Sequence, residues 1–395
     1  MVLLRNRKQT GEPVKEKHIV TGGGGYPGYR LGKALVAEGI QVVLFDIIEP
    51  CGELLESMEF VKGDIRKQSD VENVVKGADC IYHLASYGMS GRDQLNKKQI
   101  EEVNIKGTQN IIEACIKYGV QRLVYTSTFN VVFGGQEIRD GDETIPYLPL
   151  EKHPDHYSRT KSIAEMKVME ANGTKIADGR VLSTCALRLA GVYGPGEMRH
   201  LPRIVSYIER GLFAVTYGAR DSLVEFLHVE NLVLAHLLAG KALSKEKEHI
   251  AAGQTYFISD GKPVNNFEFF RPLVEGLGYS YPKVNVPLTL VYFFAFITEM
   301  VHLMVSKVYN FQPLLTRTEV YKTGVTHYFN IGKSRRDLGY EPIKQNDLQD
   351  VVKHFIKLGH GKRIQIQSKF ARYFVDVIIG IIFALLLMSC LPVTK

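Results

Sequence analysis

A glycine-rich loop between a short apolar strand and a helix, near the amino terminus, most constrains how this chain can fold. We predict the strand at 18–20, the loop at 21–28 and the helix at 29–38, and a second apolar strand follows at 41–46. Strand, helix and strand over about thirty residues form a parallel crossover unit. The alternation continues with strands at 59–61, 63–65, 80–84, 122–127 and 184–188 and helices at 68–76, 98–118 and 155–171. Continuous apolar strands indicate a sheet buried on both faces, and we predict a doubly wound parallel α/β sheet.

The spacing of the glycines predicts a dinucleotide site. Gly22 permits the tight turn, Gly25 lets the backbone approach a pyrophosphate, and Gly28 lets the helix pack closely with its N-terminus facing the phosphates. Asp46 ends the next strand eighteen residues after Gly28, where such a fold places a carboxylate on the adenine ribose. Residues 47–48 are both Ile and offer no basic side chain to a 2′-phosphate, so NAD is favoured over NADP.

Tyr157 and Lys161 are four residues apart and fall on one face of a predicted helix. A nearby ammonium favours the phenolate and lowers the pKa of a tyrosine toward the range of a general acid or base. The pair alone is a weak signal, but it follows a phosphate-binding loop, a ribose carboxylate and a strand that ends in hydroxyls at 126–128. We therefore interpret it as a proton-transfer site.

Beyond the glycines at 194 and 196 the regular alternation fades. We predict a leader at 1–17, an NAD-binding domain at 18–196, a substrate lobe with returns to the sheet at 197–358, a basic linker at 359–372 and an anchor at 373–393. The leader is expected to be disordered because it is polar and basic.

The net charge of +7 is concentrated at the ends of the chain. Residues 353–372 carry six Lys or Arg and no acidic residue, whereas residues 18–352 sum to −2. A near-neutral body argues against a nucleic-acid partner. The five cysteines are widely spaced, which fits neither a disulfide framework nor a metal site, so we predict reduced thiols and no metal.

Two apolar stretches suggest contact with membrane. Residues 373–393 are apolar apart from Asp376 near their start, and about 20 such residues span a bilayer. The basic residues before them predict a cytosolic flank. Residues 287–305 contain Glu299 and His302, which are costly at a membrane centre, so a second span, an interfacial helix and the wall of a substrate pocket all remain open.

Seven motifs occur in the order found in the extended short-chain dehydrogenases/reductases, which this chain resembles. They are Thr21-Gly22-x-x-Gly25-x-x-Gly28, Gly63-Asp64-Ile65, His83-Leu84-Ala85-Ser86, Asn104 with Gly107-Thr108, Tyr125-Thr126-Ser127-Thr128, Tyr157-x-x-x-Lys161 and Leu187-Arg188 followed by Tyr193-Gly194-Pro195. The sequence is most similar to the 3β-hydroxysteroid dehydrogenase/isomerase-like branch, and within it to family 42E. The residues that show this are 86–92, 156–162, 200–203 and 265–268. The resemblance covers about 18–345.

The resemblance implies roles for individual residues. Asp64 would contact the adenine, and Ala85 and Asn104 would belong to the cofactor site. Tyr157 would be the general acid or base, and Lys161 would bond the nicotinamide ribose. A hydroxyl orients the substrate oxygen in this family; here it is either Thr128, which stands where serine is usual, or the adjacent Ser127.

The function that follows from motifs and membrane segments is NAD-dependent oxidation of the 3β-hydroxyl of a steroid or sterol, with isomerisation as a further step by analogy. Two alternatives remain: a nucleotide-sugar epimerase or dehydratase of the same fold, and a non-catalytic scaffold that senses NAD. We expect the endoplasmic reticulum membrane as the location with a cytosolic catalytic domain, and a homodimer is compatible with the sequence.

Overall fold

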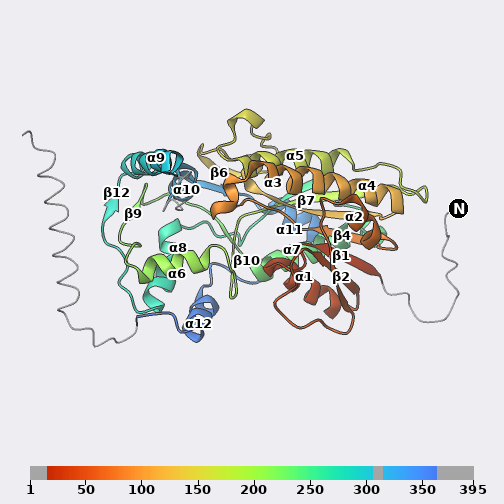
Figure 1. Cartoon of the computed structure of the whole chain (residues 1–395), viewed down its shortest axis with the longest axis horizontal. Helices are drawn as coiled ribbons and strands as arrows, with labels where there is room; N and C mark the ends of the chain where they lie inside the picture. The colour runs from red at the N-terminus through yellow and green to blue at the C-terminus, as the bar shows by residue number, and fades with distance from the viewer. Residues whose placement is uncertain (1–15, 90, 306–314, 363–395) are drawn as a thin grey trace, which may run out of the picture.

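A seven-stranded sheet forms one half of an elongated molecule (Figure 1). The computed structural model describes residues 16–89, 91–305 and 315–362. The strands are β1 (Lys17–Thr21), β2 (Gln41–Asp46), β3 (Met58–Lys62), β4 (Cys80–His83), β5 (Arg122–Thr128), β7 (Ser183–Leu189) and β11 (Gln254–Ile258). All pair in parallel in the order β11-β7-β5-β4-β1-β2-β3. The chain runs outward from β1 to β3 and then returns to β4 beside β1, which confirms the predicted doubly wound sheet.

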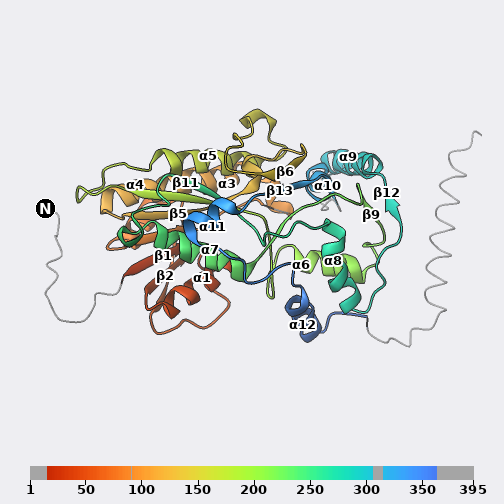
Figure 2. The same cartoon turned by 180° about the vertical axis from the view of Figure 1, so that it is seen from behind.

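Helices cover both faces of this sheet, as Figure 2 shows from behind. One face carries α1 (Tyr26–Ala37), α7 (Val229–Ala242) and α11 (Gly332–Leu338), and the other carries α2 (Gln68–Val75), α4 (Thr108–Tyr118) and α5 (His156–Glu170). Side chains of β5 alternate between the two cores: Leu123 and Tyr125 pack with the α4 and α5 side, and Val124 packs with the α1 and α7 side. Burial on both sides explains why the strands are continuous apolar runs.

The smaller lobe has a core of its own. It lies among α6 (Leu201–Glu209), α8 (Asn266–Gly276) and α12 (Gln349–Lys357). Two short parallel pairs join the lobe to the sheet domain: β8 (Gly191–Tyr193) with β10 (Phe226–His228), and β6 (Ile138–Gly141) with β13 (His327–Phe329). A third pair, β9 (Thr216–Tyr217) with β12 (Asn285–Val286), lies within the lobe. The helices α9 (Leu288–Val305) and α10 (Arg317–Gly324) lie at the outer end of the lobe (Figure 1). Strand β11 is a return to the main sheet of the kind we predicted.

Two predicted elements differ from the structure. Residues 63–65 form no strand, because β3 ends at Lys62 and the Asp64 amide donates to the Asp70 carboxylate instead of a neighbouring strand. The predicted helix at 98–118 is divided into α3 (Lys97–Glu101), a π-helical turn (Glu102–Gly107) and α4. Short 3-10 turns occupy Gly91–Leu95, Phe129–Val131, Leu150–Lys152 and Lys245–Lys247.

Within the residues that the structure describes, we find no helix with both the length and the apolarity needed to cross a bilayer. The described part of the chain therefore does not support a transmembrane helix. The predicted anchor at 373–393 lies outside the described residues. For 287–305, the 18 residues of α9 rise roughly 27 Å, less than a hydrocarbon core of about 30 Å.

Candidate functional site

The glycine-rich loop lies at the carboxyl edge of the sheet, between the ends of β1 and β4. Gly22 has a φ of +72°, and a Cβ there would approach the Ala85 amide nitrogen to 2.8 Å. A Cβ on Gly28 would come within 2.2 Å of the Gly22 carbonyl oxygen. Gly25 caps α1 without a side chain, so the first amides of that helix receive no side-chain cap. A loop of this shape leaves room for an anion against the helix N-terminus.

Asp46 lies beside this loop at the end of β2. Its carboxylate accepts hydrogen bonds from the amides of Gly24 (3.0 Å) and Ile47 (2.7 Å). Ile47 and Ile48 are exposed and apolar, so neither can bind a 2′-phosphate. The surroundings of Asp46 therefore match those that we expected for a ribose-binding carboxylate.

Asp64 follows β3 on the same edge and pairs with Arg66 (Oδ2 to Nη2 2.6 Å). The hydrogen bonds from Arg66, which outweigh the effect of burial, hold the pKa of Asp64 below its usual value. This carboxylate stays ionised, and its proposed contact with adenine remains a prediction.

His83 is a neutral histidine that links two threonine hydroxyls inside the sheet domain. Its Nδ1 lies 2.7 Å from the Thr21 hydroxyl and its Nε2 lies 2.9 Å from the Thr108 hydroxyl. Since Thr108 donates its own proton to the Asn104 carbonyl (2.7 Å), it must accept from Nε2–H, which assigns the tautomer. Burial, with a smaller effect of the Lys161 charge, lowers the pKa of His83 to about 3. His83 is thus a neutral histidine held by two hydroxyl groups.

Asn104 connects the loop after β4 with the catalytic helix. It lies in the π-helical turn, where its Nδ2 donates to the Tyr87 carbonyl (3.0 Å) and to the Thr160 hydroxyl (2.9 Å), and its Oδ1 accepts from the Tyr87 amide (2.9 Å). π-helical turns often occur at functional sites. The amide is engaged within the protein, so it serves the predicted cofactor site by holding residues 85–89 against α5.

Tyr157 stands in the first turn of α5. Asp155 caps this helix by accepting the Ser158 amide (2.7 Å). The phenol of Tyr157 is buried, and burial raises its pKa to about 12, against the opposing charge of Arg199 and a hydrogen bond with the Ser86 side chain. The Tyr157 phenol therefore keeps its proton unless a further positive charge nearby lowers its pKa.

Lys161 is buried one turn later. Its Nζ donates to the Thr126 carbonyl (2.6 Å) and lies 4.1 Å from the centroid of the Tyr125 ring. Burial lowers the pKa of Lys161 to about 7, partly offset by the charge of Glu165. The charge that lowers the pKa of Tyr157 in this structure is that of Arg199, and the expected effect of Lys161 on that pKa stays a prediction.

The two hydroxyl candidates lie on opposite faces of β5. Ser127 donates its hydroxyl proton to Glu165 of α5, which puts Ser127 on the face of the catalytic helix. Strand alternation places Thr128 with Thr126, whose hydroxyl bonds His236 of α7 at 2.7 Å on the other face. Of the two predicted residues, Ser127 lies on the face that α5 covers, where its partner Glu165 is two helical turns from Tyr157. Which of the two hydroxyls orients the substrate stays a prediction.

Glu165 and Arg188 form an ion pair next to this site that our reading of the sequence missed. The Arg188 Nη2 lies 2.8 Å from Glu165 Oε1, which also accepts from the Tyr147 hydroxyl (2.8 Å), and both charged side chains are buried. Glu165 follows Lys161 by one further helical turn, a spacing that could have indicated it. Ser86 stands in a motif that we identified, whereas no local pattern indicated Arg199.

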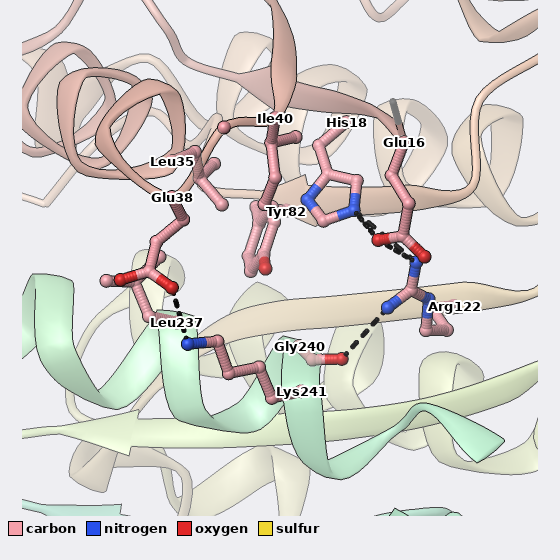
Figure 3. A pocket seen from close by; sticks show the side chains of 11 residues that line it. Glu16, His18, Leu35, Glu38, Ile40, Tyr82, Arg122, Leu237, Gly240 and Lys241 are labelled. Atoms are coloured by element: carbon pink, nitrogen blue, oxygen red, sulfur yellow. Dashed lines mark hydrogen bonds and ion pairs between the residues drawn. The ribbon is translucent and has the colours of Figure 1, made fainter. Parts of the chain in front are cut away.

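A cleft of about 290 Å³ opens at the opposite, amino edge of the sheet (Figure 3). Glu16 binds both Arg122 (2.7 Å) and His18 (2.8 Å) there, and Lys241 binds Glu38 (2.6 Å). These charges neutralise one another, and the residues come from the starts of β1 and β5 and from α7. The cleft is therefore separate from the edge that carries the glycine-rich loop and Tyr157.

Comparison with known protein families and sequences agrees with this geometry. The model of the 3-beta hydroxysteroid dehydrogenase/isomerase family matches residues 19–288. Short-chain dehydrogenase/reductase family 42E member 1 of Danio rerio is 62% identical over 376 residues, which is 95% of this chain and 97% of the relative. The human protein of that name is 63% identical over 351 residues, covering 88% of this chain and 89% of the relative. Mouse sterol-4-alpha-carboxylate 3-dehydrogenase, decarboxylating, is 32% identical over 84% of this chain and 88% of its own.

Solved structures show the same fold at lower identity. The epimerase Mth375 from Methanothermobacter thermautotrophicus has a TM-score of 0.65 at 22% identity and covers 87% of this chain and 93% of its own. A dTDP-glucose 4,6-dehydratase from Streptomyces venezuelae, a double mutant with NAD bound, has a TM-score of 0.64 at 22% identity, covering 86% of this chain and 97% of its own. Likeness at this identity establishes the fold alone.

Proposed function

Because this chain belongs to the 3-beta hydroxysteroid dehydrogenase/isomerase family, we propose that it oxidises the 3β-hydroxyl group of a steroid or sterol with NAD. The observation that carries the proposal is the burial of Tyr157 and Lys161 on α5, beside the strand end that faces the glycine-rich loop. A relative that is 32% identical over most of the chain is named as a sterol 3-dehydrogenase, which favours sterols over nucleotide sugars.

The residues of this site have distinct roles in the proposal. Tyr157 first releases its own proton to solvent and then, as the phenolate, accepts the proton of the carbinol, which returns it to the phenol; the charge of Arg199 favours the phenolate against the effect of burial. Ser127, on the face of the sheet that α5 covers, is the hydroxyl that we assign to the carbinol oxygen; to bond that oxygen it turns its proton away from Glu165, which accepts it in this structure. Bound NAD supplies the hydride acceptor for the carbinol hydrogen.

The residues at the carboxyl edge fit NAD. The cradle formed by Gly22, Gly25 and Gly28 suits the pyrophosphate, and Asp46 suits the adenine ribose. Lys161 would bond the nicotinamide ribose, and its ammonium is buried beside the end of β5 on the face that α5 covers.

Arg199 suggests a narrower substrate class. Its backbone is held by Glu197 (2.7 Å), its side chain is exposed without a hydrogen bond or ion pair among the described residues, and its charge acts on Tyr157. An acidic group next to the carbinol would pair with this guanidinium. We propose that sterols with a carboxylate beside the 3-hydroxyl are preferred over neutral ones, in keeping with the name of the mouse relative.

The location in this proposal is a membrane, with the endoplasmic reticulum as the compartment and the catalytic domain in the cytosol. It rests on the apolar run at 373–393 and the basic residues that precede it. A sterol substrate resides in the same membrane, so anchoring would place enzyme and substrate together.

The test is NADH formation by membranes that carry the full chain, supplied with NAD and a panel of 3β-hydroxysteroids with and without a neighbouring carboxylate. Tyr157→Phe keeps the packing and removes the proton acceptor, and its rate should fall at least about 100-fold. Arg199→Met should raise KM for the acidic substrates alone. Equal, background-level NADH from wild type and Tyr157→Phe on every steroid would refute the function.

A further inference from the structure

The outward face of α9 is apolar apart from Thr289, and Glu299 and His302 lie on the face toward the protein. Exposed large side chains on it are Leu290, Phe293, Phe294, Phe296, Ile297, Met300, Val301 and Met304. At 100° per residue these eight positions lie in one arc of roughly 160°. Ala295, Glu299 and His302 fall on the opposite face, where Ala295 and His302 are buried. A helix in water has the reverse arrangement.

We propose that this face of α9 docks on a lipid bilayer, where the helix lies in the interface without crossing it. In the same proposal, α10 couples the position of the docked α9 to α5, the helix that carries Tyr157. The docking of α9 rests on the proposed membrane location, but it does not depend on which substrate the protein binds. A helix that presents an apolar face to the acyl boundary and keeps its polar residues inward matches an interfacial helix. A patch of this size is unusual on a protein surrounded by water.

A bilayer fits this face better than a protein partner does. Protein interfaces carry roughly one hydrogen bond per 100–200 Å², yet Thr289 is the one exposed polar residue on the described part of this face. The helix α12, which precedes the end of the described chain, lies in the same half of the molecule as α9 (Figures 1 and 2), and the Lys362 amide donates to the Leu277 carbonyl after α8. The sequence from 353 to 372 is strongly basic, and such segments are attracted to an anionic leaflet.

Two ion pairs connect α9 to α5, the helix of Tyr157, by way of α10, and a third holds α10 to α6. Glu299 of α9 accepts hydrogen bonds from the Arg317 amide and Nε, both at 2.7 Å. Lys322 of α10 lies 3.0 Å from Asp155, the residue that caps α5 two positions before Tyr157. A third pair links α10 to α6, Glu319 with Arg203 (2.5 Å).

These contacts fix α10 between α9, α6 and α5. Asp155 is largely enclosed, and despite the opposing effect of burial, the Lys322 charge and the Ser158 hydrogen bonds lower its pKa. The cap of α5 therefore depends on where α10 places Lys322. If α9 is seated on lipid, α10 is held with it, and the first turn of α5 is held in turn.

The chain contains no tryptophan, so a single introduced indole reports docking. Phe293→Trp places it on the outward face, and Ile343→Trp places it at an exposed position on the sheet-domain side as the matched control. The full chain is mixed with vesicles of phosphatidylcholine and phosphatidylserine, with and without bromine on the acyl chains. We expect a blue shift and loss of most of the emission to brominated lipid for Phe293→Trp and neither for Ile343→Trp.

Two outcomes would overturn docking. If the Phe293→Trp indole keeps its long-wavelength emission and is not quenched, the outward face of α9 is in contact with water. If its emission is blue-shifted but brominated lipid does not quench it, that face is covered by protein. Neither measurement needs substrate or NAD, so failure here leaves the proposed reaction untouched.

Hydrogen exchange tests the link to α5. Vesicles should slow exchange of the amides at 156–161 in wild type, and Lys322→Gln should abolish that slowing while it leaves the quenching at 293 unchanged. Identical exchange in wild type and Lys322→Gln, with or without vesicles, would show that α10 carries no such coupling.

Discussion

Lys161 is needed in the proposed cofactor site, and its burial lowers the stability of the fold. A lysine with a Thr126 carbonyl and a Tyr125 ring as its neighbours has lost most of its hydration. The ammonium that a cofactor ribose would bind is therefore already desolvated, and the folded protein bears the cost in stability.

This cost has a definite pH dependence. Burial lowers the pKa of Lys161 from 10.5 to about 7, so between these values the unfolded chain binds more protons than the folded one. The free energy of unfolding of wild type then rises with pH over that window, and below it the full cost of the buried charge is present. We expect Lys161→Met to be most stabilising relative to wild type near pH 6 and least near pH 10.

Melting temperatures of both proteins across this range check the sign. The exposed Lys106→Met variant is the control and should differ from wild type by the same amount at every pH. A stability difference for Lys161→Met that does not change with pH would contradict the argument.

The two hydroxyls of β5 make a second prediction at this scale. Ser127 shares the face of Tyr157 and Thr128 does not, so Ser127→Ala should lower kcat by about 10-fold or more, as loss of an orienting hydrogen bond does. Thr128→Val should leave kcat within about threefold, since it loses only a hydrogen bond from the Asn130 amide. The reverse ranking in steady-state kinetics would assign the role to Thr128.

At the scale of elements, the π-helical turn joins three parts of the site. Asn104 projects from it and binds the backbone of Tyr87 after β4 and the side chain of Thr160 on α5. The extra residue in the turn aims the amide between the loop and the helix, which a continuous α-helix over 97–118 would not do.

Asn104→Asp keeps the size of the side chain and the acceptor but removes both donors in a buried position. We expect a loss of about 2–4 kcal/mol in the free energy of unfolding, because the buried carboxylate keeps only the Tyr87 amide as a donor and its second oxygen faces the Tyr87 carbonyl oxygen. Thr160→Val removes one of the three bonds and should cost about 1 kcal/mol. Denaturant midpoints of the two variants give the ranking, and an Asn104→Asp midpoint equal to that of wild type would be inconsistent with it.

At the scale of the whole molecule, membrane attachment depends on two segments of different kinds. A chain that ends after Gly361 keeps α9 and loses the run at 373–393. Because an interfacial helix binds reversibly while about 20 apolar residues insert stably, the shortened chain should lose most of its membrane fraction.

Carbonate extraction and vesicle flotation distinguish the two modes of attachment. The shortened chain should be released by carbonate yet still float with anionic vesicles, and Phe293→Asp in that background should abolish flotation. Resistance of the shortened chain to carbonate would identify the middle segment as the anchor.

The sequence alone determined the fold class, the glycine loop with Asp46, the Tyr157 and Lys161 pair and the family. These depend on local periodicity and on spacing within single elements, which the order of residues encodes directly. Only the tertiary structure showed that Ser127 faces α5 and that Thr128 lies on the opposite face of β5, because the side on which a strand residue points depends on what packs there. Likewise, only packing showed that α9 turns its apolar face outward, brought Glu165 to Arg188 and placed Arg199 near Tyr157, since these relations join segments that lie far apart in the chain.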